Sequence, residues 1–582
     1  MNKNLTATQN DYAIFLPATS GFYATFIGKQ RYSNYVDPAR LPASFVNNVE
    51  SLNYLEPNKG LFYYNWCLYS AGHANLDLNK FDESEDMFRN RDRTTSWVLG
   101  DSGGFQIGKG VWEGEWRDPT GPEVRAKMAD CIARGIETVP IFDKEGNPVL
   151  DKKGNQKTVK IDRVKEYQAK LDASQLKREQ VLTWMDALMD YGMVLDIPAW
   201  VERSPEGREA TGITSYDEAV AATKYNNNYF ITHRNGNCKF LNVLQGENHK
   251  QADSWYEQMK DFCDPSIYGN RAFNGWAMGG QNMCDIELVL KRVVALRFDG
   301  LLEMGKQDWM HFLGTSMLEW ACLLTDIQRA VRKYHNPNFT ISFDCASPFL
   351  ATANGQIYIQ TELNHNEKWV YRMVPSADDK KYASDTRLFK DAVQQDKIFK
   401  YKTNAKKWYK FESSPLIDQV QMKDICIYAP GDLNKIGKEG NTSWDSFSYA
   451  IQMGHNVWHH INAVQEANRQ YDSNVIPTHL NTNKVSRKSM LKYDKNTFRE
   501  VVDSIFATND RSEAEAIIKK YERFWTSIPG TRGASGVKTY NSGRIFDDFF
   551  EHSQDVTIDD EEFTDEAIEK LNRLEEEIHN GT

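Results

Sequence analysis

The sequence lacks any apolar run long enough to cross a membrane. A membrane-spanning helix needs about 20 mostly apolar residues, and no run close to that length occurs in this chain of 582 residues. The first residues, MNKNLTATQNDY, contain no apolar segment of the kind that a secretion signal requires. We therefore expect no contact with a membrane and a cytoplasmic location.

Cysteine is sparse and has no motif spacing. The eight cysteines are scattered along the chain, and no CxxC pair occurs. This excludes the disulfide framework of a small secreted protein and is typical of a large protein in a reducing compartment.

A general excess of positive charge is also missing, because the formal net charge is −11 at pH 7. The protein is therefore not coated in basic surface. Binding to a nucleic acid is still compatible with this charge, provided that the basic groups gather in one groove.

What the sequence does contain is a series of short apolar runs, each ending in a polar or glycine-rich turn, with segments of helical period between them. Such units predict an α/β fold, a (β/α)8 TIM-type barrel, whose active site is built from the loops after the strands. The runs are WVLGDSGG ending near Asp101, GMVLDIP near Asp196, FLNVLQGE near Gln245, GWAMGGQN near Gly279 and Gly280, MHFLGTS near Gly314, and FTISFDCASP near Asp344.

The predicted barrel occupies residues 1–475 and carries two insertions. Residues 143–182 contain turn signals followed by charged residues, which indicates a hairpin and then a helix. The second insertion spans about residues 363–440. Residues 476–582 are predicted to form a helical C-terminal extension with an acidic tail.

Five of these motifs, DSGGFQ, MVLD, VLQG, GWAMGG and FDCASP, resemble those of the tRNA-guanine transglycosylases in order and approximate spacing. The resemblance covers roughly residues 90–360 and continues weakly to about residue 470. That family exchanges a guanine base in nucleic acid for a 7-deazaguanine base. It uses a β/α barrel and a covalent enzyme–nucleic acid intermediate.

The resemblance implies a role for each matching residue. Asp344 corresponds to the nucleophile that attacks the ribosyl C1′ atom, and Asp101 to the general acid/base. Phe105 would stack on the base, while Asp196, Gln245 and the Gly280 amide would hydrogen-bond its edge. The remaining implied substrate-binding residues are Ser102, Gly103 and Gly279.

The chemistry of base exchange agrees with these assignments. Breaking an N-glycosidic bond creates an oxocarbenium-like centre that one carboxylate can trap while a second acid serves the leaving group. The glycines of DSGGFQ would leave a slot for a planar base that has left its stack. Taken singly, an aspartate after a strand is more often a turn or helix cap than a catalytic residue.

The chain departs from the family at its structural zinc site, which has the form CxCxxC followed by a histidine. Asp424, Cys426 and Ala429 stand at the three cysteine positions, and His455 stands at the histidine position. One thiolate, one carboxylate and an alanine cannot build such a site. We expect a zinc-less remnant, and we expect no metal or other cofactor.

Two further departures concern the polymer. Where the family has arginines that grip tRNA phosphates, the segment SPFLATANG has Leu350 and Ala353, and Glu247 replaces the second glycine of VQGG. This combination is similar to the DNA-guanine transglycosylases of phage and bacterial 7-deazaguanine DNA modification. The resemblance implies exchange of guanine in DNA for 7-cyano-7-deazaguanine.

The segment from Lys397 to Phe411 is basic with interleaved aromatic residues and is a candidate for phosphate binding and base stacking. It is equally consistent with a solvated amphipathic hairpin. The candidate nucleic-acid-binding residues in it are Lys400, Lys402, Lys406, Lys407 and Trp408.

Three alternatives stay open. The first is a tRNA-guanine transglycosylase with an altered RNA grip, and the second is a non-catalytic barrel that binds nucleic acid. Retention of both Asp101 and Asp344 disfavours the second. The third, a barrel glycosidase on free sugars, does not explain DSGGFQ. The oligomeric state is also open, with a homodimer among the options.

Overall fold

The structure is a computed structural model that describes residues 11–33, 36–80, 83–143, 146–400, 408–428, 443–483 and 493–531. Within those residues, no helix is both long enough and apolar enough to span a membrane.

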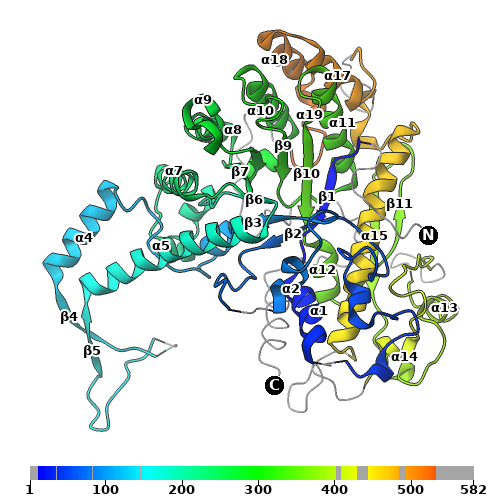
Figure 1. Cartoon of the computed structure of the whole chain (residues 1–582), viewed down its shortest axis with the longest axis horizontal. Coiled ribbons are helices and arrows are strands. Elements are labelled where there is room, and N and C mark those ends of the chain that lie inside the picture. Colours follow the sequence, from blue (N-terminus) through cyan, green and yellow to red (C-terminus); the bar gives the residue numbers. More distant parts are fainter. Residues whose placement is uncertain are drawn as a thin grey trace.

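Eight parallel strands form a nearly closed barrel, in the order β1-β10-β9-β8-β7-β6-β3-β2 (Figure 1). The ring closes where Ala18 bridges to Leu68 and the Thr19 amide donates to the Leu68 carbonyl at 3.0 Å. The predicted (β/α)8 fold is confirmed. The strands are β1 (Ile14–Pro17), β2 (Trp66–Ser70), β3 (Trp97–Asp101), β6 (Tyr191–Met193), β7 (Lys239–Leu244), β8 (Gly275–Met278), β9 (Trp309–Phe312) and β10 (Thr340–Cys345).

Helices surround this barrel, so the strands are covered on both faces and consist almost entirely of buried residues. The helix α11 shows how the cover is made, because its apolar side faces the barrel and its exposed side carries Arg329 and Lys333. The principal covering helices are α1 (Gly21–Ser33), α2 (Glu83–Arg89), α5 (Arg163–Leu188), α7 (Tyr216–His233), α8 (His249–Met259), α10 (Ile286–Phe298), α11 (Leu318–Tyr334) and α12 (Ser347–Ala353).

Aromatic rings fill the amino-terminal end of the barrel. Trp66, Trp97, Tyr191 and Trp309 are each the first residue of a strand. The ring of Trp309 lies 5.0 Å from that of Trp66 and 4.3 Å from that of Tyr191, and Trp66 lies 5.4 Å from Trp97. Because this layer fills that end of the barrel, a ligand could enter the barrel only from the opposite end.

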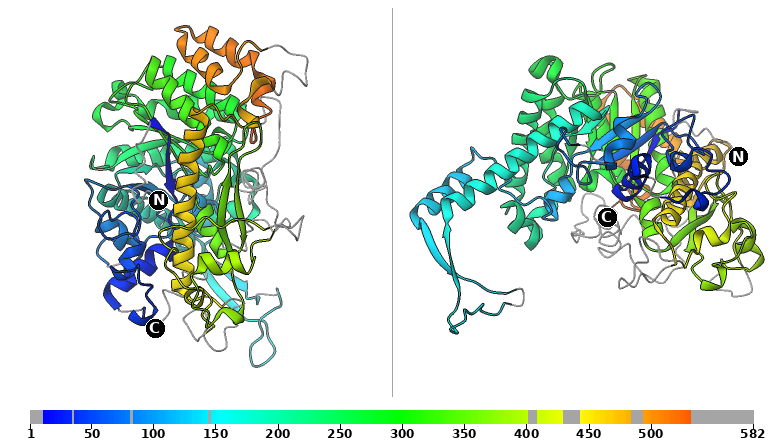
Figure 2. Two further views of the ribbon diagram at one scale, coloured as in Figure 1. Left: turned by 90° about the vertical axis from the view of Figure 1, so that its right-hand side faces the viewer. Right: turned by 60° about the horizontal axis from the view of Figure 1, so that its bottom comes forward.

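An arm projects from the barrel between β3 and β6 (Figures 1 and 2). It consists of α4 (Pro122–Arg134), an antiparallel ribbon of β4 (Ile136–Pro140) and β5 (Thr158–Asp162), and the first turns of α5. The hairpin and helix expected at 143–182 are part of it. The arm begins earlier than expected, because α4 precedes the ribbon and packs on α5.

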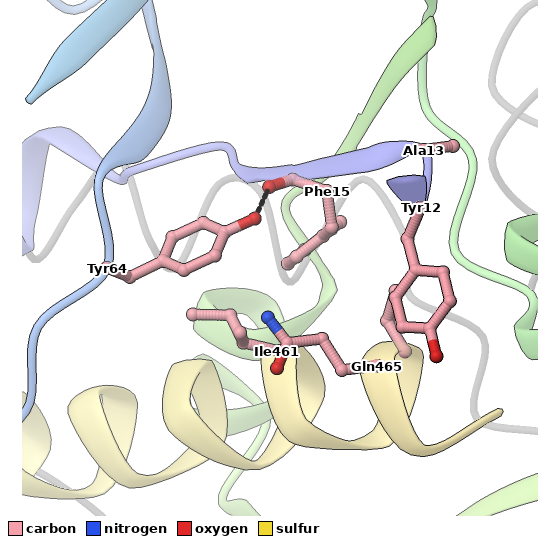
Figure 3. Close-up of a pocket in the computed structure, with 7 residues that line it drawn as sticks. Tyr12, Ala13, Phe15, Tyr64, Ile461 and Gln465 are labelled. Carbon is pink, nitrogen blue, oxygen red and sulfur yellow. Dashed lines mark hydrogen bonds between the residues drawn. The ribbon is translucent and has the colours of Figure 1, made fainter. Parts of the chain in front are cut away.

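The second insertion contains an antiparallel pair, β11 (Gln356–Glu362) and β12 (Val370–Pro375), and the short helices α13 (Phe389–Gln395) and α14 (Met422–Ile425). The long helix α15 (Ser446–Asp472) follows and lies along β1 and α12 (Figure 2). A cavity between β1 and α15 is shown in Figure 3, where the Tyr64 hydroxyl donates to the Phe15 carbonyl. Its volume of about 10 Å³ is room for one water molecule at most, so it is no substrate site.

The described part of the C-terminal extension packs on the barrel helices. The helices α17 (Phe498–Ala507), α18 (Arg511–Lys520) and α19 (Glu522–Trp525) lie against α10 and α11. Arg297 of α10 donates to the Phe506 carbonyl at 2.8 Å, and Trp320 of α11 donates to the Pro529 carbonyl at 3.3 Å. The expected acidic tail lies outside the described residues.

Candidate active site

The carboxyl-terminal end of the barrel gathers the implied catalytic and base-binding residues. Asp101 ends β3 and Asp344 is the fifth residue of β10. Asp196, Gln245 and Gly279 follow β6, β7 and β8, respectively. Because all eight strands are parallel, these positions lie at the same end of the barrel.

Asp101 lies in a site that favours its protonated form. The Ser70 hydroxyl, from the paired position on β2, donates to the Asp101 carboxylate at 2.6 Å. Removal from water raises the pKa of Asp101, and the negative charge of Asp344 raises it further; the hydrogen bonds from Ser70 and the Gly103 amide act against this. A carboxyl group with a raised pKa is suited to carry a proton to a leaving base. Ser70 was not identified from the sequence.

Asp196 and Gln245 form a buried pair. The Gln245 amide donates to the Asp196 carboxylate at 2.8 Å. Burial raises the pKa of Asp196 to about 7; the Gln245 hydrogen bond opposes the rise and the charge of Asp101 adds to it. At neutral pH this side chain therefore exchanges readily between a hydrogen-bond donor and an acceptor for a polar ligand edge.

The raised pKa of Asp196 predicts that its ionisation destabilises the fold. Its pKa rises from 3.8 to about 7 on folding, so between these pH values the folded state binds the proton and the unfolded state does not. Stability falls as pH rises through this window. The upper limit is roughly 4 kcal/mol at 1.4 kcal/mol for each pKa unit.

We expect Asp196→Asn to remove this pH dependence, because asparagine does not ionise. Urea unfolding should show the variant to be more stable than the wild type at pH 8, with the difference lost near pH 4. An equal difference at both pH values would assign the effect to packing instead of ionisation.

Hydrogen bonds from β9 and from the loop after β9 hold the Asp344 carboxylate in place. The His311 Nε2 atom lies 3.1 Å from Oδ1 of Asp344, and the Gly314 amide donates to the same oxygen at 3.0 Å. His311 is fully buried and was not identified from the sequence. The only sequence signal for it is its place in the run WMHFLG, one residue before the end of β9.

The glycines of DSGGFQ are required by what packs on them. Gly103 has φ of 84°, and a Cβ atom there would lie 2.5 Å from the Trp112 ring. A Cβ atom on Gly104 would lie 2.9 Å from the Asp196 carboxylate. The space beside these two glycines is thus occupied by the Trp112 ring and by Asp196. The slot expected there for a planar base stays a prediction.

Phe105 and Ser102 flank the two glycines in the sequence. Phe105 is half-buried, and its ring centre is 6.1 Å from that of Trp200. Ser102 is buried in the turn between β3 and the short helix α3 (Gly104–Gly108).

The turn after β8 packs directly on Gln245. A Cβ atom on Gly279 would lie 2.7 Å from the Gln245 amide nitrogen, and one on Gly280 would lie 2.5 Å from the Gly246 carbonyl. Gly280 also has a φ of 54°. Position 280 therefore requires glycine, and the missing side chain at Gly279 lets the turn after β8 pack against the Asp196–Gln245 pair.

The basic-aromatic segment is described only at its ends. Lys400 bridges to Trp408 in an antiparallel pair, and the Lys397 ammonium lies 4.0 Å from the centre of the Trp408 ring. Trp408 is 44% exposed, which leaves part of its ring accessible for stacking. Lys402, Lys406 and Lys407 lie outside the described residues.

The residues at the positions compared with a zinc site have other hydrogen-bond partners. The two ring nitrogens of His455 contact the Ser414 hydroxyl at 2.9 Å and the Tyr358 carbonyl at 2.8 Å. The Cys426 thiol donates to the Ala377 carbonyl at 3.2 Å. In the described part of the chain, no group of three or more His, Cys, Asp or Glu side chains could hold a metal ion. Ala429 lies outside that part.

The structure also shows what the residues do at the three positions that differ from the motifs of the tRNA enzymes. Leu350 and Ala353 are buried in α12, so neither presents a group to a phosphate. Glu247 forms an ion pair with Arg203 at the edge of the site.

This end of the barrel therefore combines an anchored carboxylate, a carboxyl group with a raised pKa and the buried Asp196–Gln245 pair beside the glycines of DSGGFQ. Such an arrangement can break and remake a glycosidic bond to a flat, polar base. A scan against protein-family models and a search of curated proteins found no match to this chain.

Proposed function

We propose that this protein is a pentosyltransferase that exchanges guanine in DNA for a 7-deazaguanine base, with 7-cyano-7-deazaguanine as the incoming base. The observation that carries this proposal is the meeting of Asp101, Asp196, Gln245 and Asp344 at one end of the barrel. These residues come from four separate motifs, and each lies at or just beyond the carboxyl-terminal end of a strand.

In the proposed reaction, Asp344 attacks C1′ of the target nucleotide and the bond from C1′ to the base breaks. Asp101 gives its proton to the departing guanine. The incoming base then loses a proton to Asp101 and displaces Asp344 from C1′. Two displacements on the same carbon retain its configuration.

DNA is favoured over tRNA for two reasons. The position at which the related tRNA enzymes carry phosphate-gripping arginines is filled by buried apolar residues in α12. Deoxyribose lacks the 2′-hydroxyl, so its oxocarbenium-like centre forms more easily and the anchored Asp344 is adequate for it. Phosphate contacts supply most of the sequence-independent affinity for a nucleic acid, so the polymer can change while the base site is kept.

The deciding experiment offers equal amounts of duplex DNA, single-stranded DNA and tRNA together with labelled 7-cyano-7-deazaguanine. We expect label in DNA. Label in tRNA alone would replace DNA by tRNA as the substrate. Specific binding of nucleic acid without any exchange would favour a non-catalytic binding barrel.

A further inference from the structure

Inside the barrel, a chain of hydrogen-bonded side chains leads from the aromatic layer to Asp344. We call this chain, which consists of Trp309, Ser342 and His311, the file. Trp309 and His311 alternate on β9, and Ser342 and Asp344 alternate on the neighbouring strand β10. Ser342 is paired in register with His311. Both are fully buried, so their hydrogen bonds have to be satisfied within the file.

The donors and acceptors fix the direction of this file. The indole nitrogen of Trp309 can only donate, and it lies 2.8 Å from the Ser342 hydroxyl oxygen. The same oxygen lies 2.9 Å from Nδ1 of His311. In the described part of the chain, His311 Nδ1 is the one acceptor within reach of the Ser342 hydroxyl, so the Ser342 proton goes to Nδ1. A neutral His311 ring then carries its proton on Nε2, and that proton points at Asp344.

The consequence falls on the two carboxylate oxygens of Asp344. Oδ1 receives the His311 Nε2 proton and the Gly314 amide proton, at 3.1 and 3.0 Å. Within the described ranges, no hydrogen bond to Oδ2 is recorded. The carboxylate is thus fixed about its own axis, with one oxygen engaged and the other available.

We infer that the Trp309–Ser342–His311 file is a positioning device that makes Oδ2 of Asp344 the attacking atom. This inference rests on the proposed function. Oδ2 supplies the electron pair for the new bond to C1′, and the electrons of the broken bond leave with the base, which takes its proton from Asp101. No proton moves along the file, so His311 acts through Asp344 and is not itself a catalytic residue.

The test compares His311→Leu with His311→Gln. Leucine removes the donor, whereas the glutamine amide can still donate to Oδ1. Loss of a partner that orients a metal ligand typically costs about 10–100-fold in activity, and we take the same scale for a partner that orients a nucleophile. We expect a loss of that size in kcat for His311→Leu, an unchanged KM for the incoming base, and recovery to within a few-fold of wild type in His311→Gln.

A pH profile separates positioning from packing. An N–H donor favours the ionised carboxylate, so the acid limb of the kcat profile should move to higher pH in His311→Leu. The matched control is His455→Leu, which removes another fully buried imidazole, on α15. It should lower the melting temperature and leave the acid limb in place. Unchanged kcat in His311→Leu, or no recovery in His311→Gln, would overturn the inference.

A measurement without turnover keeps this inference separate from the proposed function. In protein labelled with ¹⁵N-histidine, the His311 signal is assigned by its loss in His311→Gln. We expect the Nε2–H tautomer in the wild type and loss of that preference in Ser342→Ala. An Nδ1–H tautomer in the wild type overturns the file whether or not exchange occurs. Absence of exchange with the expected tautomer would contradict only the proposed function.

Discussion

Replacement of Asp344 by alanine or asparagine is expected to abolish base exchange, with a loss on the order of 10³-fold or more, as for other covalent nucleophiles. The physical reason is that neither alanine nor asparagine has a carboxylate that could form the covalent bond to C1′. A denaturing gel of protein incubated with DNA should show a covalent adduct for the wild type and none for either variant.

The two Asp344 variants differ in their effect on stability. Alanine leaves the buried His311 and Gly314 donors without an acceptor, and each such loss costs about 1–3 kcal/mol. The asparagine carbonyl can accept both hydrogen bonds, so Asp344→Asn should keep the wild-type melting temperature. Near-normal turnover in the asparagine variant would remove Asp344 from the nucleophile role.

Replacement of Asp101 by asparagine is expected to lower turnover by about 10²–10⁴-fold, the usual contribution of a general acid/base. The amide oxygen can still accept from Ser70, so the local geometry is preserved while the transferable proton is lost. In the wild type, turnover should fall at high pH as the Asp101 carboxyl group loses its proton. Steady-state kinetics over a range of pH should show that this fall is absent in Asp101→Asn.

Formation of the covalent protein–DNA adduct distinguishes the role of Asp101 from that of Asp344. Because Asp344 remains in Asp101→Asn, some adduct should still form on the denaturing gel even though turnover is slow. Ser70→Ala serves as the matched control, since it removes one hydrogen bond to Asp101 and retains the proton. A loss of less than about fivefold in Asp101→Asn, well below the range for a general acid, would make Asp101 a structural cap.

The barrel and the meeting of its strand ends could be predicted from the sequence because both depend on local patterns. Each apolar run that stops at a polar residue identifies a strand end, and a parallel barrel brings all such ends together. The sequence alone was therefore enough to predict that these strand ends bring together Asp101, Asp196, Gln245 and Asp344.

The residues that hydrogen-bond to Asp101 and Asp344 could not be predicted from the sequence. Ser70 meets Asp101, and His311 meets Ser342, because of the register between neighbouring strands. A single sequence contains no signal for that pairing. The position of Trp112 against Gly103 depends on the loop after α3, whose path is set by contacts that are distant along the chain. For this reason no signal in the sequence indicated that the Trp112 ring packs on Gly103.

Closure of the barrel has a consequence for synthesis on the ribosome. One edge of β1 pairs with β10, where Ile14 lies opposite Ser342. At ~5–20 residues per second, the roughly 330 residues between these strands take about 15–65 s to translate. Throughout that interval the apolar strand β1 has no partner on this edge, and an unpaired strand edge is prone to aggregation. The nascent chain should therefore depend on a holding chaperone until β10 has emerged.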